Sequence, residues 1–411
     1  MDQLSEIPLE ILSAFRDQVK SEAFSILDYW INFTVDAVHG GFFGQTGKDA
    51  LPLEAAPKGL VLNARILWTF SAAFRHYRDD RYHRMATRAF DYLLNCFTDP
   101  VYGGFYWTVD NQGKPLNDRK QIYGLAFCMY GLSEYYTATG EPRALEAAIE
   151  LFRLIEEKSF DPLHRGYFEA FARDWSQPED LRLSPKDANE KKSMNTHLHI
   201  IEAYANLYGI WQDPLLRQRI TGLLDLFASK IIDRPSGHLL LFFEEDWRAK
   251  STLVSYGHDI EAAWLLADCA QRLQDQDWIL KMKALSLQIT AAAMEGLDSD
   301  GGLWYEFEPT NRELIRQKHW WPQAEAMVGF FHCWELTGDK KFLDHCLGSW
   351  DFIRKFLIDP VNGEWFWGIG ADHSVLQDTY KTGFWKCPYH NVRACLEIEK
   401  RVQLWLAGNG F

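Results

Sequence analysis

The chain lacks the features that mark several large classes of protein. No apolar run approaches 18 residues, which argues against a membrane-spanning helix. Its 43 lysines and arginines are outnumbered by 57 aspartates and glutamates, and the formal charge of −14 argues against nucleic acids or anionic membranes as partners. The seven cysteines are odd in number and include no Cys-x-x-Cys pair, so we expect reduced thiols in a cytoplasmic protein.

Targeting and cofactor signatures are missing as well. Residues 1–24 are acidic and amphipathic, without the charged-then-apolar layout of a signal peptide. The Gly-Gly pairs lead into strand-like residues rather than helices, so none forms a glycine-rich phosphate cradle. No His-Glu-x-x-His or comparable spacing of metal ligands occurs, and no motif marks a nucleophilic serine or cysteine. These absences argue against a metal site and against a phosphate-bearing ligand.

Aromatic residues, in contrast, are abundant: they make up 15% of the chain and include 17 tryptophans. Such residues are often core, but they also suit stacking against sugar rings. A length of 411 residues makes two or three domains the default expectation, with repeat architectures and barrels as the exceptions. The presence or absence of repeats therefore decides between several domains and a single repeat-built one.

A glycine turn followed by aromatic or aliphatic residues recurs six times. The copies read HGGFFG at 39–44, YGGFYW at 102–107, RGYFEA at 165–170, SGHLLLFF at 236–243, DGGLWYEF at 300–307 and NGEWFWGI at 362–369. Their first glycines are 62–71 residues apart, and each copy resembles one arm of a short hairpin. Four of them follow an Asp-Pro pair or a near variant, a signal that ends a helix and starts a turn.

Two helical patterns lie between successive turns, for example 58–78 with 81–97, 121–138 with 142–157, and 257–273 with 277–295. Since one helix pair cannot bury its apolar faces alone, six pairs predict either an open solenoid or a closed ring. We favour an all-α (α/α)6 barrel, one domain spanning residues 1–411, with short β-hairpins at its mouth. Helices near 8–33 and 388–407 would pair to close it.

In such a ring the first helix after each hairpin is an inner helix whose N-terminus faces the mouth. These six helix starts carry unexpected polar and aromatic residues: Asn63 and Arg65; Tyr123; Asn195, His197 and His199; His258 and Glu261; Trp320, Trp321 and Glu325; Trp385 and His390. Asn195, His199 and Glu202 share one helix face, whereas His197 points elsewhere, toward packing. We expect one site where the six starts converge. His319 and the remaining histidines are assigned to surface or packing.

Three chemistries fit these residues. Three histidines suggest a metal, but they are spread over three repeats. A glycosidase needs two opposed carboxylates, which Glu261 and Glu325 would supply. Moving a proton on and off a carbon next to a carbonyl needs a neutral base and donors for the enediolate oxygens. His258 and His390 lie in the first turns of their helices, where the helix dipole disfavours imidazolium, and Arg65 would hold the oxyanion. Two imidazoles on opposite faces of C2 would epimerise it.

Five segments carry a family resemblance over nearly the whole chain: LNARILWTFSAA, SMNTHLHIIEAYANLY, SYGHDIEAAWLL, HWWPQAEAMVGF and FWKCPYHNVRACLE. With them the chain resembles the cellobiose 2-epimerases of the N-acylglucosamine 2-epimerase superfamily. The resemblance implies an (α/α)6 barrel without a cofactor that acts on a β-1,4-linked disaccharide through ring opening and a cis-enediolate. Free glucose or mannose as substrate, aldose–ketose isomerisation and glycoside hydrolysis remain alternatives.

The resemblance also implies roles for single residues. His390 and His258 would be the acid–base pair, and His199 would assist ring opening or bind the sugar. The residues implied to fix hydroxyls and imidazoles, or to pack on the sugar and shape the mouth, are Arg65, Tyr123, Asn195, Glu261, Trp321, Trp385 and Asp187. Glu325 is expected to bind the substrate, with the orientation of a neighbouring side chain as its alternative role. We expect a small sugar as the partner of a monomer or weak homodimer, with no nucleic acid and no membrane.

Overall fold

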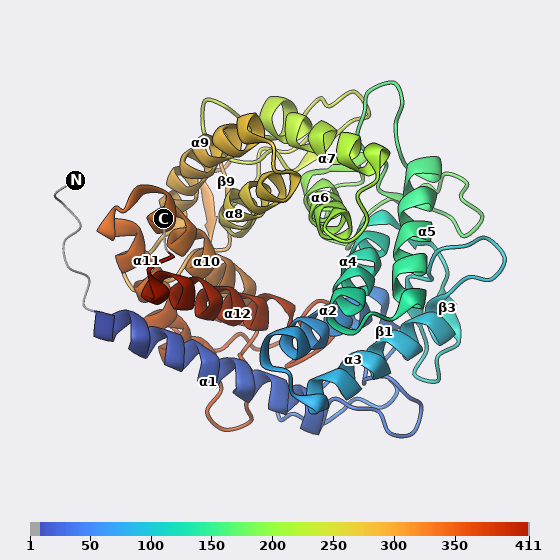
Figure 1. The fold of residues 1–411 in the computed structure, drawn as a ribbon, viewed down its shortest axis with the longest axis horizontal. Coiled ribbons are helices and arrows are strands. Elements are labelled where there is room, and N and C mark those ends of the chain that lie inside the picture. Colours follow the sequence, from blue (N-terminus) through green and yellow to red (C-terminus); the bar gives the residue numbers. More distant parts are fainter. Residues whose placement is uncertain (1–8, 410–411) are drawn as a thin grey trace.

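The structure is a computed structural model that describes residues 9–409; residues 1–8 and 410–411 of the predicted barrel lie outside it. Its helices form two concentric rings (Figure 1). The inner helices are α2 (Leu60–Tyr77), α4 (Ile122–Thr139), α6 (Met194–Tyr208), α8 (Tyr256–Leu273), α10 (Trp320–Thr337) and α12 (Tyr389–Leu404). The outer helices are α1 (Leu9–Phe33), α3 (Asp80–Tyr92), α5 (Pro142–Lys158), α7 (Pro214–Leu226), α9 (Gln276–Ala293) and α11 (Lys340–Phe352).

The inner ring is closed. Each inner helix packs against the next one along the chain, and α12 returns to α2. As predicted, the first helix of the chain pairs with the last: α1 lies along α12 (Figure 1). Side chains of α1 also reach the sixth hairpin, where Trp30 donates to Glu364 and Trp365 donates to Glu22, each over 2.8 Å. The (α/α)6 fold expected from the repeat pattern is confirmed.

The two rings differ in sequence because they differ in surroundings. Inner helices have neighbours on every side, and every residue of α4 from Ile122 to Tyr135 is buried. Outer helices bury one stripe; in α3 it runs through Tyr82, Ala86, Ala89 and Phe90, with the i, i+4, i+7, i+8 spacing of an amphipathic helix. The expected helix pairs are therefore present with boundaries within a few residues of those predicted.

The six predicted hairpins are also present, each closed by an antiparallel bridge. The bridged pairs are Val35 with Phe42, Thr98 with Phe105, Phe160 with Tyr167, Ile232 with Leu239, Leu297 with Leu303, and Ile358 with Trp365. The first glycine of every turn has a positive φ, between 73° at Gly103 and 88° at Gly301. Glycine adopts this left-handed conformation without the steric cost of a Cβ, which explains its recurrence.

Short strands connect neighbouring repeats at this end of the barrel. The strand before each of the first five inner helices pairs with a strand that follows the next hairpin. The strands are β1 (Lys58–Gly59), β2 (Thr108–Val109), β3 (Pro115–Asn117), β4 (Lys120–Gln121), β5 (Ala170–Phe171), β6 (Lys192–Ser193), β7 (Phe242–Phe243), β8 (Val254–Ser255), β9 (Glu306–Glu308), β10 (Glu313–Ile315), β11 (Gln317–His319) and β12 (Gly368–Gly370). A bridge between Thr46 and Thr382 joins the first repeat to the last and completes the circle.

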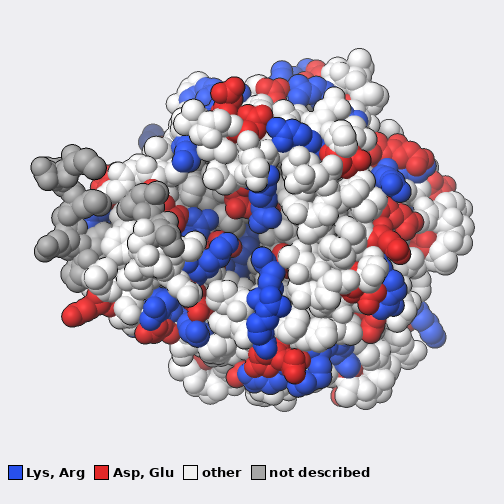
Figure 2. Space-filling model, viewed as in Figure 1, with Lys and Arg blue, Asp and Glu red and all other residues white. Residues whose placement is uncertain are grey.

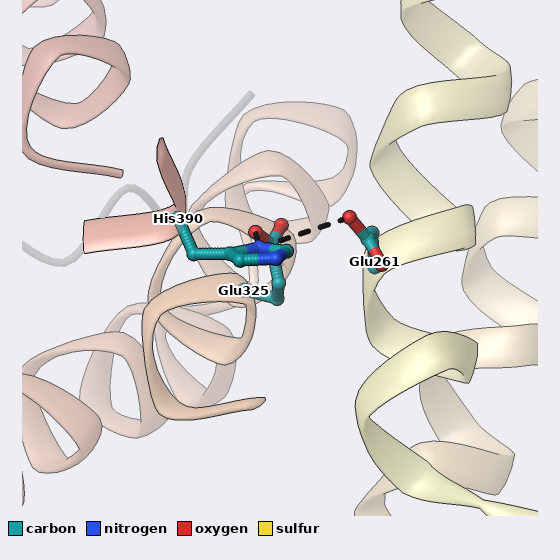
Figure 3. Close-up of side chains that lie close together, drawn as sticks. All are labelled: Glu261, Glu325 and His390. Atoms are coloured by element: carbon teal, nitrogen blue, oxygen red, sulfur yellow. Dashed lines mark hydrogen bonds and ion pairs between the residues drawn. The ribbon is translucent and has the colours of Figure 1, made fainter. Parts of the chain in front are cut away.

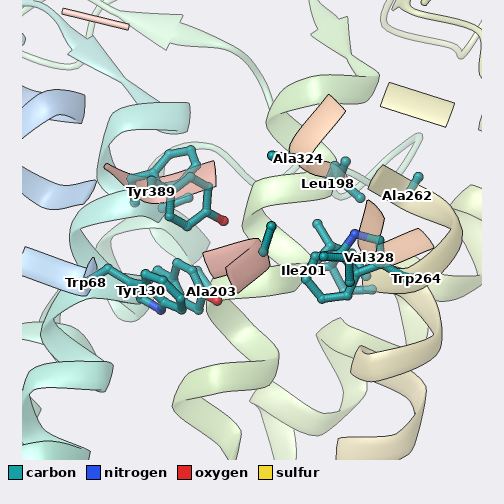
Figure 4. Close-up of a cluster of buried hydrophobic side chains, with 14 of the residues drawn as sticks. Trp68, Tyr130, Leu198, Ile201, Ala203, Ala262, Trp264, Ala324, Val328 and Tyr389 are labelled. Carbon is teal, nitrogen blue, oxygen red and sulfur yellow. The ribbon is translucent and has the colours of Figure 1, made fainter. Parts of the chain in front are cut away.

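The middle of the inner ring is a packed core rather than a channel. Side chains from all six inner helices meet there (Figure 4). Trp68 of α2 stacks on Tyr130 of α4 and meets Tyr389 of α12 edge-on, with 5.3 Å between ring centroids in both pairs. This core forms a solid base on which polar groups at the N-terminal ends of the inner helices can be held.

The surface and helix lengths agree with the charge and hydrophobicity of the sequence. Basic and acidic side chains are interspersed on the face shown in Figure 2, including the rim of its central hollow. None of the helices within residues 9–409 is both long enough and apolar enough to span a bilayer.

Candidate active site

A cavity of about 270 Å³ lies at the N-terminal ends of the inner helices. This volume is near the lower end of the range for small-molecule sites, about 300–1,000 Å³. All the predicted site residues except Glu325 line it: Arg65, Tyr123, Asp187, Asn195, His199, His258, Glu261, Trp321, Trp385 and His390. The structure thus brings together residues from all six repeats at one place.

His390 stands in the first turn of α12 with its ring fixed by a carboxylate. Its Nδ1 lies 2.7 Å from Oε1 of Glu325. Because a carboxylate can only accept, Nδ1 carries the hydrogen, and Nε2 is left as a free base. Burial lowers the pKa of His390 to about 3, although Glu325 opposes the shift. The imidazole is therefore neutral at pH 7, as a proton-abstracting base must be.

His258 occupies the first turn of α8 and is also neutral. Its Nδ1 lies 2.8 Å from the hydroxyl of Ser255, and burial lowers its pKa to about 3. The side chain of Trp321 contacts both catalytic candidates. Its ring centroid lies 4.8 Å from that of His258 and 5.6 Å from that of His390. One indole therefore lies against two uncharged imidazoles that belong to different repeats.

A third imidazole repeats the carboxylate arrangement. His199 Nδ1 lies 2.9 Å from Oε2 of Glu202, one turn further along α6, and burial lowers the pKa of His199. The ring packs against Phe127 and Tyr123, at centroid distances of 4.5 and 5.1 Å. His199 thus offers the cavity another oriented, neutral nitrogen.

Hydrogen-bond donors and acceptors surround these bases. Arg65 donates to the hydroxyl of Tyr123 over 2.7 Å, and its guanidinium lies over the rings of Phe127 and Tyr389 at 4.2 and 5.0 Å. Nε of Arg65 and Oδ1 of Asn195 are buried without a hydrogen-bond partner among the described residues. Buried polar atoms are nearly always satisfied, so these two are available to a polar ligand such as a sugar.

Three acidic side chains and one arginine lie at and below the cavity floor. Arg393 donates to Glu202 (2.5 Å), Glu261 (3.0 Å) and Glu325 (2.6 Å), and all four side chains are at most 5% exposed. Burial and the charge of Glu325 raise the pKa of Glu261 to about 8. Burial alone would raise the pKa of Glu325, but Arg393 and His390 lower it to about 2.

These charges bear on the two alternative chemistries. Glu261, Glu325 and His390 have the composition of a metal site (Figure 3), yet the guanidinium of Arg393 already supplies a cation to both carboxylates. A glycosidase would need Glu261 and Glu325 on opposite sides of a substrate. Instead, they share one nitrogen of Arg393, and Glu325 lies behind His390 rather than on the cavity wall. Glu325 is thus placed to orient His390, the alternative role that the sequence allowed for it.

Lys186 makes two side-chain contacts at the mouth of the cavity. Lys186, next to Asp187 in the loop between β5 and β6, donates to the hydroxyl of Tyr305 and lies 3.7 Å from Glu306 of β9. Asp187 is held within its own loop, where its carboxylate accepts from the backbone and hydroxyl of Ser184. This loop therefore reaches across the mouth to the fifth repeat.

Three other polar residues near the helix starts lie in different surroundings. Asn63 is not at the cavity: its amide donates to the carbonyl of Gly59 and ties the start of α2. His197 packs between hairpin and helix as expected, accepting from the backbone of Tyr167. The assignment of His319 to surface or packing is incomplete, because its ring stacks on Tyr305 at 3.9 Å and also lines the cavity.

Arg393 is the main site residue that sequence reasoning missed, and a signal for it existed. Lysine stands two residues before the start of several inner helices, and the residue seven positions after it faces the site. Counted in this way from Lys58, Lys120, Lys192, Val254, Lys318 and Lys386, the residues are Arg65, Phe127, His199, Glu261, Glu325 and Arg393. Aligning the repeats on these lysines would have placed Arg393 in the site.

Comparisons with known proteins find relatives along most of the chain. Residues 41–394 match the N-acylglucosamine 2-epimerase (GlcNAc 2-epimerase) family. A cellobiose 2-epimerase of Bacteroides fragilis is 49% identical over 374 residues, which cover 91% of this chain and 95% of the relative. The solved structure of a cellobiose 2-epimerase from Bacillus thermoamylovorans B4167 superposes with a TM-score of 0.90 at 39% identity, over 95% of this chain and all of that one.

A more distant relative, a D-mannose isomerase of Marinomonas mediterranea, is 24% identical over 89% of this chain and 92% of its own. The family and the fold agree with the resemblance read from the five sequence segments. The chain belongs to the N-acylglucosamine 2-epimerase family.

Proposed function

We propose that this protein is a 2-epimerase that inverts C2 of the reducing-end aldose in a β-1,4-linked disaccharide such as cellobiose or lactose. One observation carries the proposal: two neutral imidazoles from the fourth and sixth repeats, His258 half-buried and His390 buried, line one cavity and contact the same tryptophan. The 49% identity to a cellobiose 2-epimerase over most of the chain supports the disaccharide as substrate.

In this mechanism the sugar ring opens first, with His199 assisting the transfer of a proton to the ring oxygen. One of His258 and His390 then removes the C2 proton, and electrons move toward the carbonyl oxygen to form a cis-enediolate. Arg65 stabilises the developing oxyanion, and Tyr123 supports the guanidinium through their hydrogen bond. The second imidazole takes up a proton from solvent and delivers it to the opposite face of C2, which converts the glucose to the mannose configuration, and the first imidazole releases the abstracted proton to solvent.

The remaining residues bind the substrate in this proposal. Trp321 and Trp385 pack on the sugar, Asn195 and Glu261 bind hydroxyls, and Asp187 acts from the mouth. Since burial and Glu325 raise the pKa of Glu261 to about 8, its carboxyl can donate to a sugar hydroxyl at neutral pH while Oε1 accepts from Arg393. The same enediolate can take up a proton at C1, so we also expect a minor ketose product.

Isotope exchange tests the proposal. Incubation with cellobiose in D2O, followed by NMR, should give glucosyl-mannose with deuterium at C2. His390→Ala and His258→Ala should each lower kcat by at least about 10²-fold, the usual contribution of general acid–base catalysis. The exposed His373 provides the matched control, and His373→Gln should keep full activity.

Other products would point to the alternatives. Free glucose together with unlabelled cellobiose would indicate a glycosidase and overturn the proposal. Faster turnover of free mannose than of cellobiose would indicate an epimerase or isomerase of free monosaccharides. A rate that falls on treatment with a chelator would indicate a metal at Glu261, Glu325 and His390.

A further inference from the structure

Arg393 connects two of the three imidazoles that line the cavity. One of its terminal nitrogens donates to Glu202 and the other to Glu325. Glu202 in turn accepts from His199, and Glu325 accepts from His390. The result is a continuous chain of hydrogen bonds from α6 through α12 to α10 and back to α12.

The guanidinium is rigidly held. Its Cζ atom lies 4.2 Å from the ring centroid of Tyr389 and 4.9 Å from that of Trp264. The hydroxyl of Tyr389 also donates to Glu202, and the indole of Trp264 donates to Glu325 over 3.0 Å. A lysine could not reproduce this arrangement, because an ammonium is a point charge without the planar fork that serves two carboxylates at once.

The charge count gives Arg393 a second consequence. Three buried carboxylates face one guanidinium, so they cannot all be charged at low cost. Glu202 and Glu325 each hold an imidazole N–H and have pKa values below normal despite their burial, whereas the pKa of Glu261 is raised. Arg393 therefore keeps ionised the two carboxylates that orient imidazoles.

We propose that Arg393 is a positioning residue that acts through Glu202 on His199 and through Glu325 on His390, so that one guanidinium sets up both ring opening and proton transfer at C2. The inference rests on the proposed function. Arg393 does not line the cavity, and we therefore expect its effect in kcat rather than in KM.

Two assays on the same enzyme separate the two branches. Proton NMR of cellobiose follows the interconversion of its anomers, which reports ring opening, and deuterium uptake at C2 reports proton transfer. Glu202→Gln should slow mainly the first, and Glu325→Gln mainly the second. Arg393→Lys and Arg393→Met should slow both at least tenfold with KM nearly unchanged.

The pH profile gives a readout that a merely structural role would not move. Glu325 is faced by His390 and Arg393 of α12, by Glu261 of α8 and by the indole of Trp264. Loss of the guanidinium raises the pKa of Glu325, and a protonated Glu325 no longer accepts from His390. The acid limb of kcat should therefore move to higher pH in Arg393→Met.

Arg401 provides the matched control. It is another largely buried arginine of α12, two turns further on, paired with Glu335 and Glu397 away from the cavity. Arg401→Met should lower thermal stability but leave both rates per folded molecule and the acid limb unchanged. The proposal is overturned if Arg393→Lys behaves in the same way, or if Glu202→Gln and Glu325→Gln affect both rates equally. A wild-type enzyme that catalyses anomer interconversion but no C2 exchange would instead refute the proposed function.

Discussion

Lysine 192 offers a sharp test of how the hairpins are held on the barrel. Its side chain is fully buried, and its ammonium donates to Asp161 over 2.6 Å and to the carbonyls of Arg165 and Glu245, each over 2.7 Å. Lys192→Met would remove all three bonds and leave the Asp161 carboxylate, 3% exposed on its side chain, with only backbone donors. The third hairpin would then retain a buried charge without a counterion.

Breaking a buried ion pair by removing one partner costs about 3–5 kcal/mol, a large part of the roughly 5–15 kcal/mol that stabilises a typical protein. We expect Lys192→Met to lose about this much free energy of unfolding, measured by urea denaturation at pH 7. Burial opposes ionisation of Asp161, yet Lys192 and two backbone amides hold its pKa below the ordinary value. The loss of unfolding free energy in Lys192→Met, relative to the unsubstituted protein, should therefore become smaller as the pH falls toward about 4.

The fourth repeat supplies a natural control. There Val254 takes the place of the lysine, and the equivalent Asp233 is only half-buried and accepts from Ser236. Asp233→Asn should change stability by less than about 1 kcal/mol. The double variant Lys192→Met/Asp161→Asn should be more stable than Lys192→Met alone. A single variant that loses less than about 1 kcal/mol, or a double variant that is no better, would contradict the reasoning.

Two further predictions concern pH and the mouth of the cavity. Burial lowers the pKa of His197 to about 3, below its unfolded value of about 6.5, so the unfolded state takes up this proton first and stability falls with decreasing pH in that window. His197→Gln should flatten the slope of unfolding free energy between pH 4 and 6 by about 1.4 kcal/mol per pH unit, and an unchanged slope would mean that His197 titrates normally. Lys186→Met should raise KM for cellobiose severalfold with little change in kcat, because it detaches the Asp187 loop from Tyr305. Lys250→Met, which breaks an exposed pair with Glu244, should leave steady-state kinetics unchanged. Equal effects of the two lysine variants on KM would show that the contact between Lys186 and Tyr305 does not influence substrate binding.

Much of the fold was predictable because its determinants are local. Glycine turns, helix-ending Asp-Pro pairs and apolar periodicity are each read within a few residues, and their sixfold repetition identifies the ring. The convergence of the site followed from the same logic, since helix starts that follow equivalent hairpins must face the same end of a closed barrel. For this reason His258 and His390 were assigned to one cavity although 132 positions separate them.

The connections between side chains were not predictable, because they depend on how different repeats pack against each other. Arg393 has its acidic partners on three other helices, and nothing near it in the sequence indicates them. His319 was assigned to packing because its neighbours along the chain are ordinary; its place at the cavity depends on stacking with Tyr305. Glu325 has a polar position that suits a sugar ligand equally well, and only its bond to His390 distinguishes the two roles.

Equivalent positions in the six repeats separate the scaffold from the site. An aspartate begins every hairpin turn, and in five of the six repeats a buried lysine pairs with it: Lys58 with Asp36, Lys120 with Asp99, Lys192 with Asp161, Lys318 with Asp298 and Lys381 with Asp359. In four of these pairs the lysine stands two residues before an inner helix, whereas in the sixth repeat Lys381 takes this role and the aligned Lys386 pairs with Glu364. The pairing recurs because its task, holding a hairpin against the barrel, is the same in each of these repeats. Two turns into each inner helix the backbone is equally regular, yet the residues are Arg65, Phe127, His199, Glu261, Glu325 and Arg393. A position that carries four residue types in six copies while its backbone setting stays the same is under a demand that the fold does not impose. Around this cavity that demand is the placement of His199 and His390, whose Nδ1 atoms bond to Glu202 and Glu325, while Arg393 donates to both of these buried carboxylates.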